Sequence, residues 1–305
     1  MDPLDFTGRV VVVTGGTRGI GAAVARAFQA AGAHVLTCAR TGPSSAAPSS
    51  AELSGPATPA ADGEGPAFFP ADVRDPAQAA ALIAEAVRRF GRLDVLINNA
   101  GGAPTASADT ASPRLHAKII ELNLIAPLHV AQAANAVMRE QADGGVILMI
   151  GSVSGTRPSP GTAAYGAAKA GLHHLATSLA AEWAPRVRVN SLVLGPVDSP
   201  SRSPRDVSEV GRSGRAVGLG REAEGVDGET VGPDREAVEP GAVSSVARTV
   251  PMGRAATAGE VASACLLLAS PLAGYITGAS LAVHGGGEWP AYLADLRDTA
   301  YRAGK

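Results

Sequence analysis

Tyr165 and Lys169 stand four residues apart, and Ser152 precedes the tyrosine by thirteen residues. A tyrosine hydroxyl has an ordinary pKa near ~10, so it needs a nearby positive charge to exchange protons near neutrality. Residues i and i+4 share one face of an α-helix, which lets Lys169 supply that charge. A serine hydroxyl can both donate to and accept from a substrate oxygen. The three residues predict proton transfer to and from an alcohol oxygen, whereas a tyrosine–lysine pair alone would fit an ordinary helix surface.

A glycine-rich segment near the start of the chain is suited to holding a phosphate. Residues 14–21 read Thr-Gly-Gly-Thr-Arg-Gly-Ile-Gly and follow the β-branched run Val10–Val13. Such a turn lets the backbone approach a pyrophosphate, and the following helix offers its N–H groups and partial positive charge. The spacing differs from the generic G-x-G-x-x-G fingerprint. Its place between a strand and a helix favours a dinucleotide over a tight turn without a ligand.

The end of the second predicted strand bears on which dinucleotide is bound. It reads Cys38-Ala39-Arg40 and lacks the acid that usually takes the ribose hydroxyls of NAD. Arg40 and Arg18 could clamp a 2′-phosphate, because guanidinium matches phosphate geometry. We therefore expect NADP(H), with NAD(H) as the alternative if Arg40 is only a solvated loop residue. Asp72 is placed either to meet the adenine or to cap the helix that begins near Pro76.

Alternating strands and helices must position these residues. The hydrophobic pattern predicts strands at 9–14, 34–38, 67–71, 93–97, 146–150, 187–194 and 280–283. It predicts helices at 19–31 (ended by Gly32), 76–90, 114–138 (with a bend at Pro127), 163–184 and 258–269. This alternation predicts an α/β fold, a Rossmann-type doubly wound parallel sheet of about seven strands with helices on both faces.

Composition narrows the class of protein. The 305 residues are 46% hydrophobic, 4% aromatic and carry a net charge of −2, which argues against a nucleic-acid partner. No apolar run is long enough for a membrane span, no signal peptide precedes the first strand, and Cys38 and Cys265 show no paired spacing, so we expect a cytoplasmic protein. The histidines give no metal-ligand pattern, and we expect no metal; His173 and His174 should pack or face solvent.

Two stretches interrupt the pattern of a single domain over residues 1–305. Residues 41–66 are rich in Pro, Ala and Ser and predict a flexible surface insertion. Residues 201–250 mix Gly, Arg and acidic residues and predict a mobile loop or lid over a substrate, with disordered filler as the alternative.

Taken together, the motifs resemble those of the short-chain dehydrogenase/reductase family. The resemblance rests on the glycine turn at 14–21, Asn98-Asn99-Ala100-Gly101, Asn123 within Glu121–Leu124, and the set Ser152, Tyr165 and Lys169. The motifs follow one another in the family's order over essentially the whole chain apart from the two insertions. One departure is Leu194, which replaces the usual proline before Gly195-Pro196-Val197-Asp198-Ser199.

The resemblance implies roles for particular residues. Tyr165 would be the general acid or base, Lys169 would lower its pKa and hold the nicotinamide ribose, and Ser152 would orient the substrate oxygen. Asn123 would support a water-linked proton relay to Lys169. The implied cofactor-binding residues are Gly15, Thr17, Arg18, Gly19, Ile20, Gly21, Arg40, Asp72, Val73, Asn99, Ala100, Gly101, Tyr165, Lys169, Gly195, Val197 and Ser199.

The resemblance also implies a reaction. We expect an NADP(H)-linked ketoreductase or alcohol dehydrogenase that acts on a small-molecule carbonyl or alcohol. The long glycine-rich stretch at 201–250, at the position that usually covers the substrate, suggests the hypothesis of a bulky or hydrophobic ketone of a biosynthetic pathway. We expect a homodimer or homotetramer, with the helices at 114–138 and 163–184 either at the interface or buried within one subunit. Three alternatives are an NAD-dependent alcohol dehydrogenase, a non-catalytic dinucleotide-binding regulator, and an epimerase or dehydratase that recycles its nicotinamide.

Overall fold

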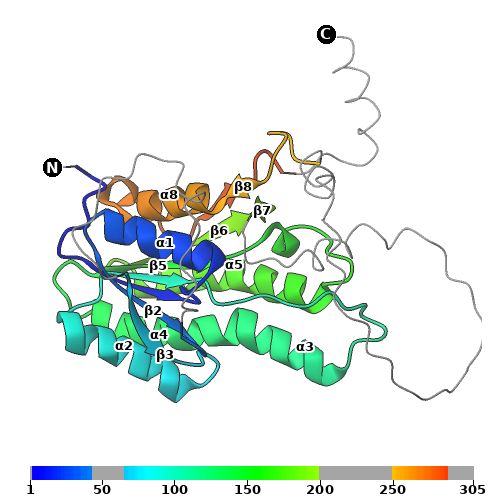
Figure 1. Ribbon diagram of the computed structural model, residues 1–305, viewed down its shortest axis with the longest axis horizontal. Helices are drawn as coiled ribbons and strands as arrows, with labels where there is room; N and C mark the ends of the chain where they lie inside the picture. The colour runs from blue at the N-terminus through cyan, green and yellow to red at the C-terminus, as the bar shows by residue number, and fades with distance from the viewer. Residues whose placement is uncertain (1, 43–64, 199–248, 288–305) are drawn as a thin grey trace, which may run out of the picture.

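The computed structural model describes residues 2–42, 65–198 and 249–287 (Figure 1). Within them, seven strands form one parallel sheet in the order β3-β2-β1-β4-β5-β6-β9. The strands are β1 (Val10–Thr14), β2 (His34–Ala39), β3 (Ala67–Pro70), β4 (Val95–Asn98), β5 (Gly145–Ile150), β6 (Val187–Leu194) and β9 (Ser280–Val283). The strand order reverses between β1 and β4, where ligands bind in open α/β sheets. The predicted doubly wound parallel sheet is confirmed.

Helices cover both faces of this sheet. In Figure 1, α1 (Gly19–Ala30) and α8 (Ala258–Ala269) lie together on one face. The other face is covered by α2 (Pro76–Phe90), α4 (Ala126–Met138) and α5 (Ala163–Trp183), which share one hydrophobic core. Within the described ranges, no helix is long and apolar enough to cross a membrane.

The valines of β1 explain why the sheet is buried on both sides. Val10 and Val12 belong to the core that contains α2, α4 and α5, whereas Val11 and Val13 belong to the core that contains α1 and α8. All four side chains are fully buried. Since side chains alternate between the faces of a strand, a continuous β-branched run supplies both cores at once.

The helix predicted over 114–138 is interrupted. It consists of α3 (Pro113–Ile120), a π-helical turn (Glu121–Ile125) and α4. The amide of Ala126 donates to the carbonyl of Glu121, which is the wider hydrogen bond of a π-turn. Pro127 has no N–H, so the carbonyl of Asn123 cannot receive its ordinary α-helical hydrogen bond. The irregularity that we expected at Pro127 therefore begins one turn earlier and contains Asn123.

Several short elements complete the described part. A 3₁₀ turn (Val153–Gly155) follows β5, a second one (Pro271–Ala273) follows α8, and β7 (Val197–Asp198) pairs with β8 (Ala256–Thr257) in a small second sheet. Most of the two predicted insertions, 41–66 and 201–250, lies outside the described residues.

Candidate active site

Tyr165 and Lys169 lie on the same face of α5, as the predicted helix over 163–184 requires. The Lys169 Nζ lies 5.6 Å from the centroid of the Tyr165 ring. Lys169 is 4% exposed, and its Nζ donates a hydrogen bond to the carbonyl of Ile150 at 2.8 Å. The helix therefore brings a buried amine to the end of β5, next to a half-buried phenol ring.

The buried position changes the titration of this lysine. Burial lowers the pKa of Lys169 from 10.5 to about 8, because the desolvated ammonium is less stable than it is in water. The lysine remains largely protonated at neutral pH. A charge in this poorly screened place favours the ionised form of a neighbouring phenol.

Ser152 lies at the carboxyl end of β5, where it caps the 3₁₀ turn over residues 153–155. Its Oγ accepts a hydrogen bond from the amide of Ser154 at 3.2 Å. This turn packs against α5. The structure thus brings Ser152 to the same edge of the sheet as Tyr165 and Lys169.

Asn123 is fully buried, and its side chain is held by the main chain on three sides. Its Nδ2 donates to the carbonyls of Gly102 and Ile119, and its Oδ1 accepts from the amide of Gly102, each at 2.9 Å. The asparagine therefore fastens the loop after β4 to the π-turn. Its main-chain carbonyl cannot receive an α-helical hydrogen bond, because Pro127 has no N–H.

The glycine turn joins β1 to α1 in a conformation that requires glycine. Gly15 and Gly19 have φ values of 64° and 55°, in the left-handed region that favours glycine. A Cβ on Gly21 would lie 2.3 Å from the carbonyl oxygen of Gly15. The first turn of α1 receives no side-chain cap from Arg18, whereas α2 is capped by Asp75. The first amides of α1 therefore lack a side-chain cap, which is the arrangement that suits a phosphate-binding helix start.

The segment after β4 is bonded to this turn and also lies beside Lys169 on α5. Thr14 Oγ1 accepts hydrogen bonds from the amides of Asn99 and Ala100, each at 3.0 Å, and Asn99 Nδ2 donates to the carbonyls of Thr14 and Gly15 at 2.9 and 3.1 Å. A Cβ on Gly101 would lie 2.7 Å from Asn123 Oδ1 and 3.3 Å from Lys169 Nζ. The missing side chain leaves a cradle directly beside Lys169.

Asp72 is paired with a cation that the sequence did not indicate. Asp72 and Arg74 form an ion pair, with Arg74 Nε 2.9 Å from Asp72 Oδ1. The Arg74 guanidinium, and to a smaller extent Arg40, holds the pKa of Asp72 below its ordinary value. Asp75, not Asp72, caps α2, so the capping alternative for Asp72 is wrong. Arg40 is exposed at the end of β2 and Val73 is buried.

The remaining expected positions lie past β6. The amide of Gly195 donates to the carbonyl of Val283 at 3.0 Å, and Val197 opens β7. Ser199 lies outside the described residues. Thr17 and Ile20 lie in the glycine turn and the first turn of α1.

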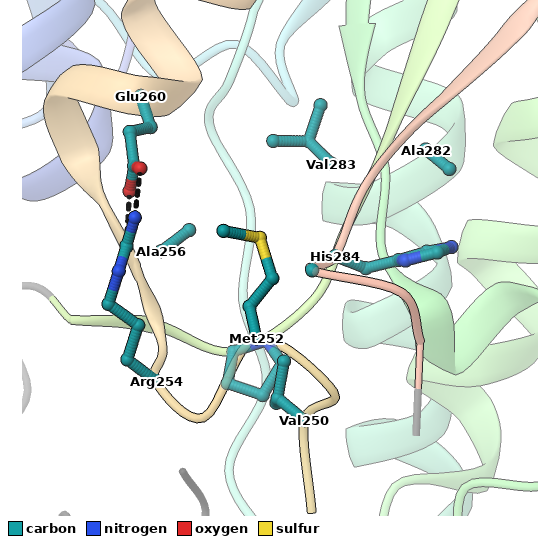
Figure 2. A pocket seen from close by; sticks show the side chains of 10 residues that line it. Val250, Met252, Arg254, Ala256, Glu260, Ala282, Val283 and His284 are labelled. Atoms are coloured by element: carbon teal, nitrogen blue, oxygen red, sulfur yellow. Dashed lines mark hydrogen bonds and ion pairs between the residues drawn. The ribbon is translucent and has the colours of Figure 1, made fainter. Parts of the chain in front are cut away.

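A small pocket of about 150 Å³ opens at the carboxyl end of β9, between Pro196, Val250 and Met252. Figure 2 shows Met252 between His284 on one side and the ion pair of Arg254 with Glu260 on the other. Neither Ser152, Tyr165 nor Lys169 lines it. This pocket therefore adjoins the carboxyl-terminal edge of the sheet but is separate from the three predicted catalytic side chains.

The chain's own residues fit a nicotinamide dinucleotide. The left-handed Gly15 and Gly19 and the uncapped start of α1 suit a pyrophosphate, and the space at Gly101 beside Lys169 suits a ribose. The residues that would hold the dinucleotide are those of the glycine turn, Arg40, Asp72, Val73, Asn99 to Gly101, Tyr165, Lys169, Gly195 and Val197.

Comparison with known proteins agrees with this geometry. The sequence model of the family described as short chain dehydrogenase matches residues 9–209, and that of enoyl-(acyl carrier protein) reductase matches residues 234–288. An uncharacterized oxidoreductase of Mycobacterium tuberculosis is 31% identical over 95% of this chain and 96% of its own. The 3-oxoacyl-(acyl-carrier-protein) reductase FabG of Escherichia coli K12 is 32% identical over 93% of this chain and 98% of its own.

A solved structure extends the likeness to three dimensions. The ligand-free aldohexose dehydrogenase of Thermoplasma acidophilum superposes with a TM-score of 0.73 at 26% identity, covering 92% of this chain and 94% of that one. The family binds a nicotinamide dinucleotide and acts on CH–OH or C=O groups. The chain belongs to the short-chain dehydrogenase/reductase family of oxidoreductases.

Proposed function

We propose that this protein is an NADP(H)-dependent ketoreductase in which Tyr165 is the general acid. The observation that carries the proposal is the meeting of Tyr165, buried Lys169 and Ser152 at one edge of the sheet. A regulator that only bound a dinucleotide would have no use for a serine hydroxyl and a proton-donating tyrosine placed together for a substrate oxygen. Their arrangement supports turnover.

The reaction divides between the bound cofactor and the chain. When bound, the nicotinamide supplies the hydride that reduces a carbonyl carbon, or accepts one from a secondary alcohol. Tyr165 Oη gives its proton to the carbonyl oxygen as the carbon is reduced, and takes it back in the oxidation. Ser152 Oγ holds the same oxygen by a hydrogen bond, which fixes the carbonyl relative to the phenol.

Lys169 and Asn123 restore the proton on Tyr165. The Lys169 ammonium stabilises the phenolate that remains after the transfer. The main-chain carbonyl of Asn123 holds a water that passes a proton from solvent towards Lys169. The side chain of Asn123 already bonds to the main chain of Gly102 and Ile119. The part of Asn123 in this relay is therefore assigned to its main-chain carbonyl.

The choice of NADP(H) is supported by charge at the adenosine end. Arg40 follows β2 where NAD-dependent proteins place an acid, and Arg18 precedes α1. Asp72, the nearby acid, is already paired with Arg74. A 2′-phosphate would therefore meet guanidinium groups instead of an unpaired carboxylate.

The substrate we propose is a bulky or hydrophobic ketone, in a single-domain cytoplasmic enzyme that forms a homodimer or homotetramer. The test is to incubate purified protein with NADPH and a panel of ketones that includes 3-oxoacyl thioesters, and to quantify both cofactor and alcohol. One alcohol formed per NADPH consumed supports the proposal. Product formation without net NADPH consumption would indicate an enzyme that recycles its nicotinamide, and NADPH binding without turnover of any ketone would indicate a regulator.

A further inference from the structure

We propose that His173 is a positioning residue, which holds Ser152 in register with Tyr165 through a hydrogen bond to the Ser152 main-chain oxygen. This inference rests on the proposed function, since it assigns to Ser152 the orientation of a substrate oxygen. It concerns a histidine that the sequence suggested only packs or faces solvent.

His173, on α5, belongs to a chain of hydrogen bonds that connects four elements. His173 Nε2 lies 3.2 Å from the carbonyl oxygen of Ser152, and its Nδ1 lies 3.0 Å from Ser191 Oγ on β6. Ser191 Oγ in turn lies 2.8 Å from Ser280 Oγ on β9. His173 and Ser191 are both buried. A continuous polar chain therefore runs from β9 through β6 and α5 to the turn that carries Ser152.

The partners fix the direction of each hydrogen bond. A carbonyl oxygen can only accept, so Nε2 carries the proton and donates to Ser152. The Nδ1 of a neutral imidazole then accepts, and the Ser191 hydroxyl donates to it. Burial, and to a smaller extent the charge of Lys169, lowers the pKa of His173 and keeps the imidazole neutral at neutral pH. The neutral ring with Nε2–H is the form that this chain of hydrogen bonds requires.

Two glycines leave space for the imidazole ring of His173, which a side chain at either position would contact too closely. A Cβ on Gly151 would lie 2.0 Å from His173 Cε1, and a Cβ on Gly155 would lie 3.0 Å from His173 Cδ2. Glycines therefore flank Ser152 closely on the chain, and the imidazole fills the room they leave. The ring can support the serine because the backbone on both sides of it lies directly against the ring.

Lys169 and His173 both bond to the segment of residues 150–152, which leads from β5 into the 3₁₀ turn. Lys169 Nζ donates to the carbonyl of Ile150, and His173 Nε2 donates to that of Ser152, two residues further along. The two side chains lie one turn apart on α5, and alternate carbonyls of an extended segment point the same way. The helix that carries Tyr165 is thereby fastened to the segment that carries Ser152.

The two amide isosteres of histidine provide the test. In His173→Gln the side-chain amide can reach the position of Nε2 and donate to Ser152, whereas in His173→Asn it reaches only the position of Nδ1. We expect His173→Asn to lower kcat by about 10- to 100-fold, with NADPH affinity unchanged, and His173→Gln to recover most of that loss. His174→Asn, at an exposed position of the same helix, is the matched control.

Each result decides the proposal. Equal losses in the Asn and Gln variants would show that His173 only fills space, and wild-type kcat in both would show that Ser152 needs no support; either overturns it. If the wild-type protein reduces no carbonyl compound, the proposed function falls and this inference with it.

A second measurement does not depend on turnover. The ¹⁵N resonances of the His173 ring should report the neutral form protonated on Nε2, and the Ser191→Ala variant should shift them. A ring protonated on Nδ1 could not donate from Nε2 to the Ser152 carbonyl, and this result would overturn the proposal even in an active enzyme.

Discussion

The ammonium of Lys169 lies 5.6 Å from the centroid of the Tyr165 ring, one turn away on α5. A buried charge at this distance is poorly screened by water, so it acts on the phenol more strongly than a surface lysine would. The hydrogen bond from Lys169 Nζ to the Ile150 carbonyl holds the charge in place. The proton-transfer chemistry proposed above depends on this pair.

The first prediction concerns the cost of burying Lys169. Its pKa is lowered to about 8 in the folded protein, from an ordinary value of 10.5. Below the folded pKa both states hold the proton, and burial of the charge destabilises the fold. Between the two values the unfolded chain keeps a proton that the folded one has released, so the free energy of unfolding rises with pH. Relative to Lys169→Met, the wild type should gain about 2 kcal/mol between pH ~7 and pH ~9.5.

Urea denaturation of both proteins at several pH values measures this difference. Titrating groups that the charge of Lys169 does not reach cancel between the two proteins, because the variant changes only position 169. A difference that stays flat over this range would mean that the lysine keeps an ordinary pKa in the folded state.

The second prediction concerns the cradle beside the lysine. Gly101→Ala places a Cβ 2.7 Å from Asn123 Oδ1 and 3.3 Å from Lys169 Nζ. We propose that the nicotinamide ribose lies in this space, so the methyl group should lower NADPH affinity by about 10-fold or more. In Gly42→Ala the nearest atom, on Phe68, is at an ordinary 3.8 Å, which makes that variant the control. Wild-type affinity in Gly101→Ala would place the ribose elsewhere.

The third prediction concerns cofactor choice. Arg40→Asp replaces a cation with the acid that NAD-dependent proteins use, so NADPH should bind about 100-fold more weakly while NADH binds as well or better. Titration followed by nicotinamide fluorescence measures both affinities. Arg139→Asp, next to the end of α4, makes the same charge change away from the glycine turn. Equal NADPH affinity in wild type and Arg40→Asp would exclude Arg40 as the phosphate ligand.

Much of the fold could be predicted because local signals were strong. The four successive valines of β1 pack into the hydrophobic cores on both faces of the sheet. Their run alone therefore indicated a strand that is covered on both sides. Tyr165 and Lys169 meet because helical spacing is a local property. The start of α2 was predicted correctly from Pro76, although the capping residue proved to be Asp75.

Other features depend on contacts that sequence spacing does not encode. Pro127 indicated an irregularity in this helix, but the bonds of the Asn123 side chain to Gly102 join the π-turn to a loop that is distant in sequence. The ion pair of Arg74 with Asp72 depends on the direction in which the two side chains point, which the sequence does not show. His173 was set aside because its partners, Ser152 and Ser191, come from other elements.

The most direct test of the central claim is the turnover of Tyr165→Phe. This variant removes one oxygen and leaves the ring beside Lys169, so NADPH binding should persist while kcat falls by about 100-fold or more. Tyr275→Phe, at a fully exposed tyrosine, is the matched control and should behave like the wild type. The measurement is NADPH-dependent reduction of the best ketone from the panel. Loss of turnover with retained binding is the predicted result, and wild-type turnover in Tyr165→Phe would contradict the assignment of Tyr165 as the general acid.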